Sequence, residues 1–304
     1  MFEIAISQMT TPRWDLSREV DRIAAHGFEA ISVWRPKISD IGVAPAAALI
    51  AAAGLRVSSV QWAGGFTGGD GRSFDESIDD ALEAIETAEA LAAPVLVIHS
   101  GCRGGHTRSH ARRLLAEAIE LLAAPARQAG VTLAVKPMHP VAAAGYSFVS
   151  RLGEAVELVE GFDDPAVRLA LDLWHWGDDP EIGRLLPRLA ERTAVVQVAD
   201  RLGPATAAED RLPAGHGQLP LADVVADLAA HDFRGELEFD PVGETVEILG
   251  YEGVLAETRL VATAWSARLA EAASGISRTA SGPGHFRGAG GRRSHASSQT
   301  VSPG

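Results

Sequence analysis

The amino-acid sequence predicts a single (β/α)8 TIM barrel, an α/β fold. Eight short apolar runs recur along the chain, helical patterns separate them, and the repeat fills about 270 residues, which is the usual size of this barrel. The chain has 304 residues, 46% of them hydrophobic, so it can bury a large core. An open doubly wound sheet is the alternative, but the turn from Ser7 to Pro12 lacks the glycines of a dinucleotide-binding loop.

The eight predicted strands are mostly apolar on both faces, which is typical of parallel strands covered by helices. Most are rich in β-branched residues, and turn signals bound them. In chain order we expect strands at Phe2–Ser7, Ala30–Trp34, Arg56–Trp62, Val95–Ser100, Val131–Lys136, Val167–Leu173, Ala194–Ala199 and Glu236–Asp240.

The segments between these strands carry helix boundaries. Ser73 is followed three residues later by Glu76, the spacing of a capping box at the start of a helix. Gly27, Gly130 and Gly161 each follow a helical pattern and precede a strand, as glycines that cap the C-terminal end of a helix do. Each predicted strand is therefore followed by helix, as the barrel requires.

The end of the chain differs from the rest in composition. Residues 272–304 are rich in glycine and serine, with four arginines and no acidic residue, so they cannot bury enough apolar surface to offset chain entropy. The sequence predicts one barrel domain over residues 1–271 and a disordered tail over residues 272–304.

Charge and composition limit the partners. The net charge is −13, which argues against nucleic acid or an anionic membrane surface as the main partner. No apolar run reaches the roughly 18 residues that span a bilayer. Cys102 is the single cysteine, and the chain opens on a strand-like segment rather than a leader, so we expect a cytoplasmic protein.

Ionisable and polar residues cluster where the predicted strands end. In a parallel barrel the reactive groups lie at the carboxyl ends of the strands, and an unpaired buried charge there costs several kcal/mol. The residues at these ends are His99, Lys136, His139, Asp172, His175, Gln197, Arg201 and Glu238. Asp172, Gln197 and Glu238 are three oxygen-donor side chains that suit a hard cation such as Mg²⁺ or Mn²⁺. A network of hydrogen-bonded core residues explains the same three positions equally well.

Five stretches resemble the xylose-isomerase-like barrels of sugar phosphate isomerases and epimerases, a family that also includes sugar-acid and inosose dehydratases. They are LAVKPMHP (133–140), LALDLWHWG (169–177), VVQVADR (195–201), the R-x-P-x-G-x-G run from Arg211 to Gly217, and GELEF (235–239). The resemblance covers the chain from Met1 to about Leu269 and is specific for the superfamily but not for a substrate.

The resemblance implies a divalent metal held by residues on strands five to eight, and this carries over to Asp172, Gln197 and Glu238. On strand five the family has glutamate, whereas this chain has Lys136, whose ammonium repels a metal. A metal can bind through three ligands and water, or the ammonium can take the place of the cation. A neutral lysine can instead form a Schiff base, and a structural ion pair in a non-catalytic homologue is the fourth alternative. We favour the ammonium or the structural pair over an intact metal site.

The activity that the resemblance implies is proton transfer next to the carbonyl of a sugar or sugar derivative. Glu238 is the expected base, and His139, His175 and Lys136 are the other expected catalytic residues. We therefore predict an isomerase or epimerase acting on a small sugar or sugar phosphate. The alternatives are a dehydratase or lyase on an oxidised sugar that depends on Lys136, and a homologue that only binds a sugar or a protein partner.

The mouth of the barrel also contains candidate substrate-binding residues. Arg201 and Arg211, together with the glycine-containing turn from Gly215 to Gly217, favour a phosphate or carboxylate, although surface salt bridges are the simpler explanation. Aromatic faces at strand ends can stack on a sugar ring or simply pack in the core. Trp34, Trp62 and Trp174 are the aromatic residues predicted to bind the substrate, and His99 is a further predicted substrate-binding residue. Barrels of this kind often associate through their outer helices, so a homo-oligomer is a further expected partner.

Overall fold

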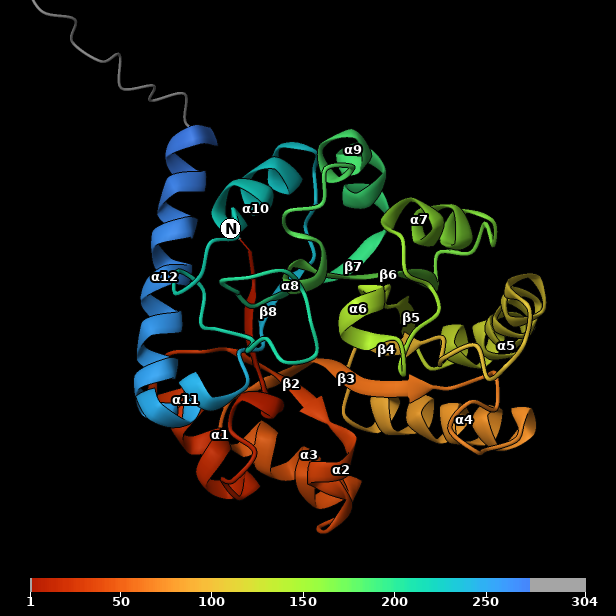
Figure 1. Ribbon diagram of the computed structural model, residues 1–304. Coiled ribbons are helices and arrows are strands. Elements are labelled where there is room, and N and C mark those ends of the chain that lie inside the picture. Colours follow the sequence, from red (N-terminus) through yellow and green to blue (C-terminus); the bar gives the residue numbers. More distant parts are fainter. Residues whose placement is uncertain (1, 274–304) are drawn as a thin grey trace, which may run out of the picture.

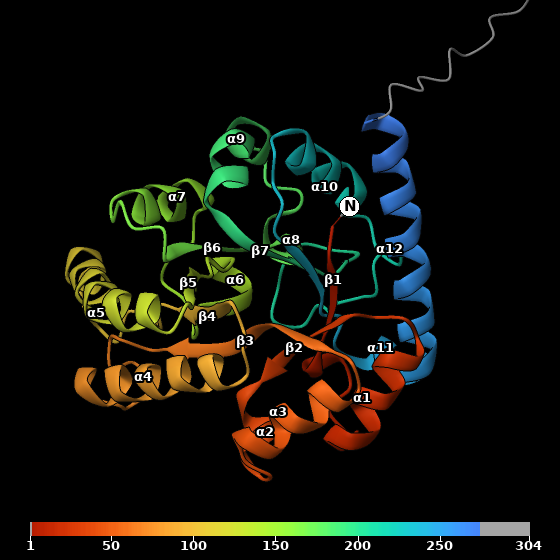
Figure 2. The same cartoon turned by 180° about the vertical axis from the view of Figure 1, so that it is seen from behind.

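The computed structural model describes residues 2–273 and forms a closed barrel of eight parallel strands, arranged from β1 to β8 in chain order (Figure 1; Figure 2 from behind). This confirms the predicted fold. The strands are β1 (Ile4–Ser7), β2 (Ala30–Trp34), β3 (Arg56–Gly64), β4 (Val95–His99), β5 (Thr132–Val135), β6 (Val167–Asp172), β7 (Thr193–Val198) and β8 (Glu236–Phe239). Each overlaps the run predicted for it, with shifts of up to two residues at the ends.

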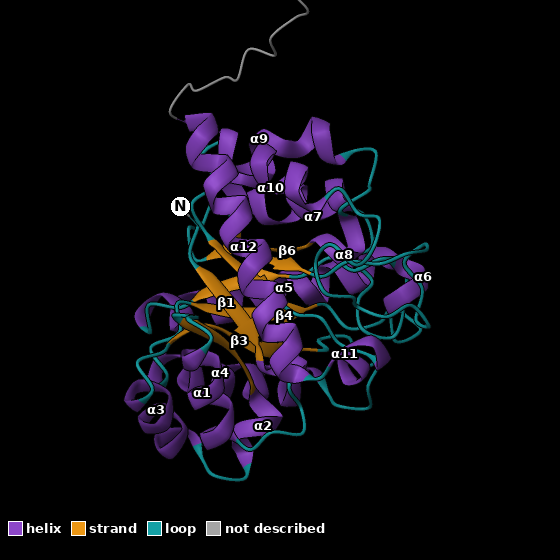
Figure 3. Cartoon of the chain, turned by 90° about the vertical axis from the view of Figure 1, so that its left-hand side faces the viewer, coloured by secondary structure: helices purple, strands orange, loops and turns teal. Residues whose placement is uncertain are grey.

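Helices surround the barrel, and three short ones, α6, α8 and α11, lie together at one end of it (Figure 3). These three come directly after β5, β6 and β8 in the chain, so they mark the carboxyl ends of the strands. The helical elements are η1 (Gln8–Thr10), α1 (Leu16–Ala25), α2 (Arg35–Ser39), α3 (Val43–Ala52), α4 (Phe74–Ala90), α5 (Arg108–Gln128), α6 (Pro140–Ala143), α7 (Leu152–Glu160), α8 (Leu173–Trp176), α9 (Ile182–Arg192), α10 (Leu221–Ala230), α11 (Glu244–Leu249) and α12 (Tyr251–Ala273).

The helix ends follow the local sequence signals. The Ser73 hydroxyl accepts a hydrogen bond from the Glu76 amide at 3.1 Å, and the Ser73 amide donates to the Glu76 carboxylate at 2.7 Å, so the predicted capping box starts α4. Gly27 and Gly130 adopt the left-handed conformation, with φ of 78° and 69°. Gly161 caps α7 with a helical φ of −66°, so it does not use the freedom of glycine.

Alternation along the strands separates the core from the site. One set of side chains packs outward against the helices, while Val95, Val97, Ala134, Ala170 and Val195 form a small separate apolar cluster. Side chains two positions apart on a strand point the same way. Lys136, Asp172 and Gln197 lie two positions after Ala134, Ala170 and Val195, so they also face inward, at the mouth of the barrel. Asp172 pairs in register with Gln197, and Gln197 with Glu238.

Helix α12 ends at Ala273, two residues beyond the predicted domain boundary. Residues 274–304, and with them nearly all of the predicted disordered tail, lie outside the described residues. Within residues 2–273 every helix is too short or too polar to cross a membrane.

Candidate functional site

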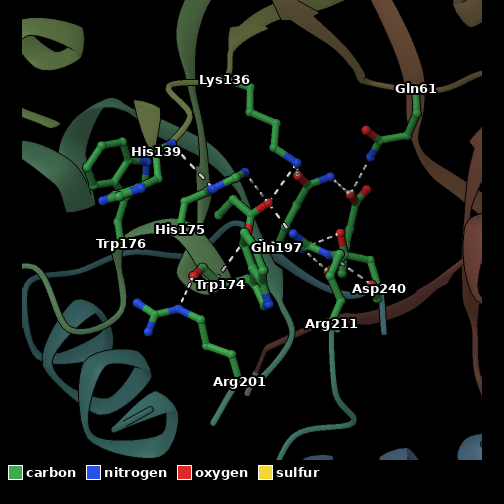
Figure 4. A network of polar contacts seen from close by, with 12 residues as sticks. Gln61, Lys136, His139, Trp174, His175, Trp176, Gln197, Arg201, Arg211 and Asp240 are labelled. Carbon is green, nitrogen blue, oxygen red and sulfur yellow. Dashed lines mark hydrogen bonds and ion pairs between the residues drawn. The ribbon is translucent and has the colours of Figure 1, made fainter. Parts of the chain in front are cut away.

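The centre of the site is an ion pair between β5 and β6 (Figure 4). The Lys136 ammonium lies 2.7 Å from Asp172 Oδ2 and donates a hydrogen bond to Gln197 Oε1 at 2.6 Å. Asp172 is fully buried, and its Oδ1 accepts a hydrogen bond from the Trp174 amide at 2.9 Å. Burial opposes ionisation of Asp172, but the charges of Arg211 and Lys136 outweigh it and hold the pKa of Asp172 well below its usual range.

Glu238 is linked to this ion pair through the side-chain amide of Gln197, which donates to Glu238 Oε2 at 3.2 Å. Ser58 donates to Glu238 Oε1 at 2.6 Å and Gln61 donates to Oε2 at 3.1 Å. Glu238 is fully buried and its closest donors are neutral, so burial raises its pKa to about 7. A carboxyl group with this pKa can accept and return a proton near neutral pH.

Arg211 covers the site from the loop after β7. Its Nη2 lies 2.7 Å from both carboxylate oxygens of Asp240 and 3.1 Å from Asp172. Backbone hydrogen bonds in both directions between Arg211 and Val242 hold it against the loop after β8. Its guanidinium carbon lies 5.3 Å from the centroid of the Trp174 ring, at cation–π distance.

Two histidines border the Lys136–Asp172 pair. The His139 amide donates to His175 Nδ1 at 3.3 Å, so a neutral His175 carries its proton on Nε2, which lies 3.8 Å from Asp172 Oδ2. Burial lowers the pKa of His175 to about 3, assisted by Lys136 and Arg211, so His175 is neutral. His139 Nδ1 is buried and has no hydrogen-bond partner among residues 2–273; its ring packs against Trp176 with centroids 5.9 Å apart.

The remaining predicted residues lie in two different environments. Arg201 is buried, with its guanidinium bonded to the carbonyl oxygens of Trp174 and Gly203 and paired with Asp178. The Trp174 indole N–H donates to the Asp210 carbonyl at 2.9 Å. Both side chains are therefore held by the protein itself.

On the other side of the mouth, Trp34 and Trp62 are half-buried and line a cavity of about 580 Å³ with Arg35 and Gln61. His99 Nδ1 lies 2.9 Å from the Tyr146 carbonyl oxygen. Because a carbonyl can only accept, this nitrogen carries the proton and Nε2 is left as an acceptor. Burial lowers the pKa of His99, which keeps its ring neutral.

Comparisons with known proteins place this chain in a family. A profile described as "Xylose isomerase-like TIM barrel" matches residues 20–255. The chain belongs to the xylose isomerase-like TIM barrel family. A search of curated proteins finds no match.

Solved structures share the barrel over nearly the whole described chain. A Sinorhizobium meliloti 1021 protein is 27% identical, covering 85% of this chain and 96% of its own, with a TM-score of 0.77. An L-ribulose 3-epimerase is 17% identical, covering 92% and 100%, with a TM-score of 0.74. A barrel protein from Mycobacterium smegmatis in complex with magnesium is 16% identical, covering 88% and 98%, with a TM-score of 0.67. The likeness to the last two establishes the fold alone.

The residues of this family member do not fit a divalent cation. The Lys136 ammonium lies within hydrogen-bond distance of both Asp172 and Gln197, so a positive group already occupies the space between two of the three expected ligands. Among residues 2–273, no three histidine, cysteine, aspartate or glutamate side chains are grouped to hold a metal. Asp172, Gln197 and Glu238 do lie side by side on β6, β7 and β8, and the Lys136 amine contacts the first two of them.

Sequence reasoning missed three members of this site: Ser58, Gln61 and Asp240. The first two lie on β3, where the run RVSSVQW contains Ser58, Ser59 and Gln61 after the initial arginine, in a strand that is otherwise apolar. Such polar residues in a buried strand are a signal, because buried polar groups need partners. Asp240 follows β8 directly and was recognised only as the end of a strand.

Proposed function

We propose that this family member transfers a proton at the carbon next to the carbonyl of a sugar or sugar derivative, as an isomerase or epimerase, and uses the Lys136 ammonium in place of a metal. The observation that carries the proposal is the contact of Lys136 with both Asp172 and Gln197, at 2.7 and 2.6 Å. The Gln197 amide then connects this cation to Glu238, so cation and base belong to one hydrogen-bonded unit.

In the proposed reaction the Glu238 carboxylate takes a proton from carbon, and the C–H electron pair becomes the double bond of an enediolate. The negative charge moves to the former carbonyl oxygen, where the ammonium stabilises it. An ammonium has three N–H donors; one donates to Gln197, and Asp172 Oδ2 is held as an ion pair at 2.7 Å, which leaves at least one donor for the substrate. Return of the proton from Glu238 to the neighbouring carbon gives an isomer, whereas an epimer requires a second acid that delivers a proton to the opposite face of the same carbon.

His175 and His139 are suited to positioning the substrate and moving hydroxyl protons. A neutral His175 donates through Nε2, and His139 has one buried nitrogen with no partner in the described chain. Small sugars carry hydroxyl groups that can satisfy both nitrogens.

The alternative is a lyase in which Lys136 forms a Schiff base with a ketone. That reaction needs a neutral amine free to attack the ketone, whereas the Lys136 nitrogen is paired with Asp172 at 2.7 Å and donates to Gln197 at 2.6 Å. Borohydride reduction with a ketose distinguishes the two, and Lys37 is the only other lysine in the chain, so labelling is simple to assign. We expect no reduced adduct at Lys136; an adduct there would establish the lyase.

The proposed function is tested by hydrogen exchange. Ketoses are incubated with the protein in D₂O containing EDTA, and NMR follows deuterium at the carbon next to the carbonyl. We expect exchange in wild type and a loss of at least about 100-fold in Glu238→Gln, within the usual contribution of a general base. Exchange that requires added Mn²⁺, or that survives in Glu238→Gln, would contradict the proposal. A homologue that only binds sugars would exchange nothing.

A further inference from the structure

We infer that the substrate is an uncharged sugar rather than a sugar phosphate or sugar acid. This inference rests on the proposed function and specifies its substrate class. It follows from three places at the mouth where an anionic group would be expected to bind. In each, carboxylates and backbone carbonyls of the protein already accept most of the hydrogen bonds that an anion would need.

Arg201 is the first of these places. Its Nε donates to the Trp174 carbonyl at 2.8 Å, its Nη1 donates to the Gly203 carbonyl at 2.6 Å, and its Nη2 pairs with the Asp178 carboxylate. All three nitrogens are engaged, and the residue is 5% exposed. A phosphate would have to displace both the carboxylate and the loop that Arg201 holds.

Arg211 is the second place. Its Nη2 contacts Asp240 at 2.7 Å and Asp172 at 3.1 Å, and its Nε contacts the Asp240 carbonyl at 3.3 Å. Of the three guanidinium nitrogens, only Nη1 has no hydrogen-bond partner within residues 2–273. One such group suits a hydroxyl, whereas carboxylate or phosphate recognition by arginine is often bidentate.

The turn from Gly215 to Gly217 is the third place. The buried Asp200 carboxylate accepts hydrogen bonds from the amides of Arg201 at 2.9 Å, Gly215 at 3.0 Å and Leu219 at 3.0 Å. A Cβ atom at Gly217 would lie 2.3 Å from Asp200 Oδ1, so the loop closes tightly around this side chain. Within the turn, the Gly215 amide is therefore occupied by an internal anion, and the His216 amide donates to the Pro213 carbonyl at 3.0 Å, so two of its three amides are not free to cradle a phosphate.

The charges at the centre leave no cation in excess. Within residues 2–273, Lys136 and Arg211 pair with Asp172 and Asp240, and Glu238 is connected to them only through Gln197. Two positive groups therefore balance two carboxylates, and an ionised Glu238 adds a third negative charge. Bringing a further anion into this buried region costs desolvation with no free cation to offset it. Hydroxyl and carbonyl groups do not carry this cost.

The test compares ketohexoses with their 6-phosphates. Proton exchange in D₂O gives kcat/KM, and calorimetry gives binding independently of turnover. We expect wild type to prefer the neutral sugar by at least about tenfold, the effect of one charge-assisted hydrogen bond. Asp240→Asn, which releases Arg211 from its carboxylate, is expected to move the ratio toward the phosphate by about tenfold. Asp223→Asn is the matched control, because Asp223 pairs with Arg268 on the outer surface.

The outcomes separate this inference from the proposed function. Preferential binding of the neutral sugar without exchange supports the inference and contradicts the proposed reaction. Exchange with a preference for the sugar phosphate supports the proposed reaction and contradicts the inference. A phosphate preference that disappears in Arg103→Gln would place the anion in the 360 Å³ surface cavity lined by Arg103 and Arg108, and it would also overturn the inference. If Asp240→Asn does not fold, the wild-type ratio decides.

Discussion

Replacing Lys136 by glutamate is expected to turn the ammonium position into a metal site. The change removes the cation that lies 2.7 Å from the fully buried Asp172, and loss of one partner from a buried pair costs about 3–5 kcal/mol. A second carboxylate about 4 Å from Asp172 adds about 4 kcal/mol of repulsion at an effective dielectric constant of about 20. Protonation relieves part of this, but the total approaches the 5–15 kcal/mol stability of a typical domain.

A divalent cation should reverse the loss, because Lys136→Glu together with Asp172, Gln197 and Glu238 provides four oxygen ligands. Urea unfolding in EDTA and in Mn²⁺ measures the effect. At a free Mn²⁺ concentration of 100 times Kd, the expected gain in stability is about 2.7 kcal/mol. Lys136→Met is the control, since it removes the charge without adding a ligand. Equal stabilisation of wild type by Mn²⁺, or no response in a folded Lys136→Glu protein, would refute the reasoning.

Three further predictions concern pH and stability. Glu238 has a pKa raised to about 7, so between about pH 4.3 and 7 the folded protein binds a proton that the unfolded chain has released. Stability should therefore fall as pH rises through this window, by up to about 1.4 kcal/mol per pH unit, and the fall should be absent in Glu238→Gln when urea unfolding is repeated across it. Ser73→Ala should lower the free energy of unfolding in urea by about 1 kcal/mol through loss of the α4 cap, and the rate of deuterium exchange into the substrate should not change. Lys37→Met should cost about 3–5 kcal/mol, because Lys37 lies 2.7 Å from the buried Glu19; an unchanged urea midpoint would contradict this.

The sequence was sufficient to predict the barrel and the convergence of Asp172, Gln197 and Glu238. Both follow from local regularities: short apolar runs predict the strands, and the carboxyl ends of parallel strands meet at one end of a barrel. Lys136 was predicted in the same way, because it ends an apolar run. What the spacing left open was whether a metal or the amine holds the carboxylates together, and this depends on a side-chain conformation.

The partners of the loop residues could not be predicted, because long loops have no periodicity to fix them. Arg211 meets Asp240 since its loop pairs with Val242 after β8, a contact between distant segments. Asp200 fills the glycine-containing turn, and no spacing rule distinguishes a turn that binds a phosphate from one that folds around its own carboxylate. Gln61 and Ser58 lie on β3 and reach Glu238 on β8, which is not a neighbouring strand, so strand spacing alone does not fix this contact.

Lys136 has two roles that must be separated before its presence can be taken as evidence of catalysis. Asp172 is fully buried and needs a cation for the protein to fold, so an ion pair alone explains why a lysine is tolerated. It does not explain why the second acceptor of Lys136 is Gln197, whose amide also holds Glu238. Nor does stability favour a buried carboxyl group whose pKa is raised to about 7, because ionising it in place costs free energy. That cost is the reason we propose Glu238 as the base and Lys136 as the group that stabilises the charge.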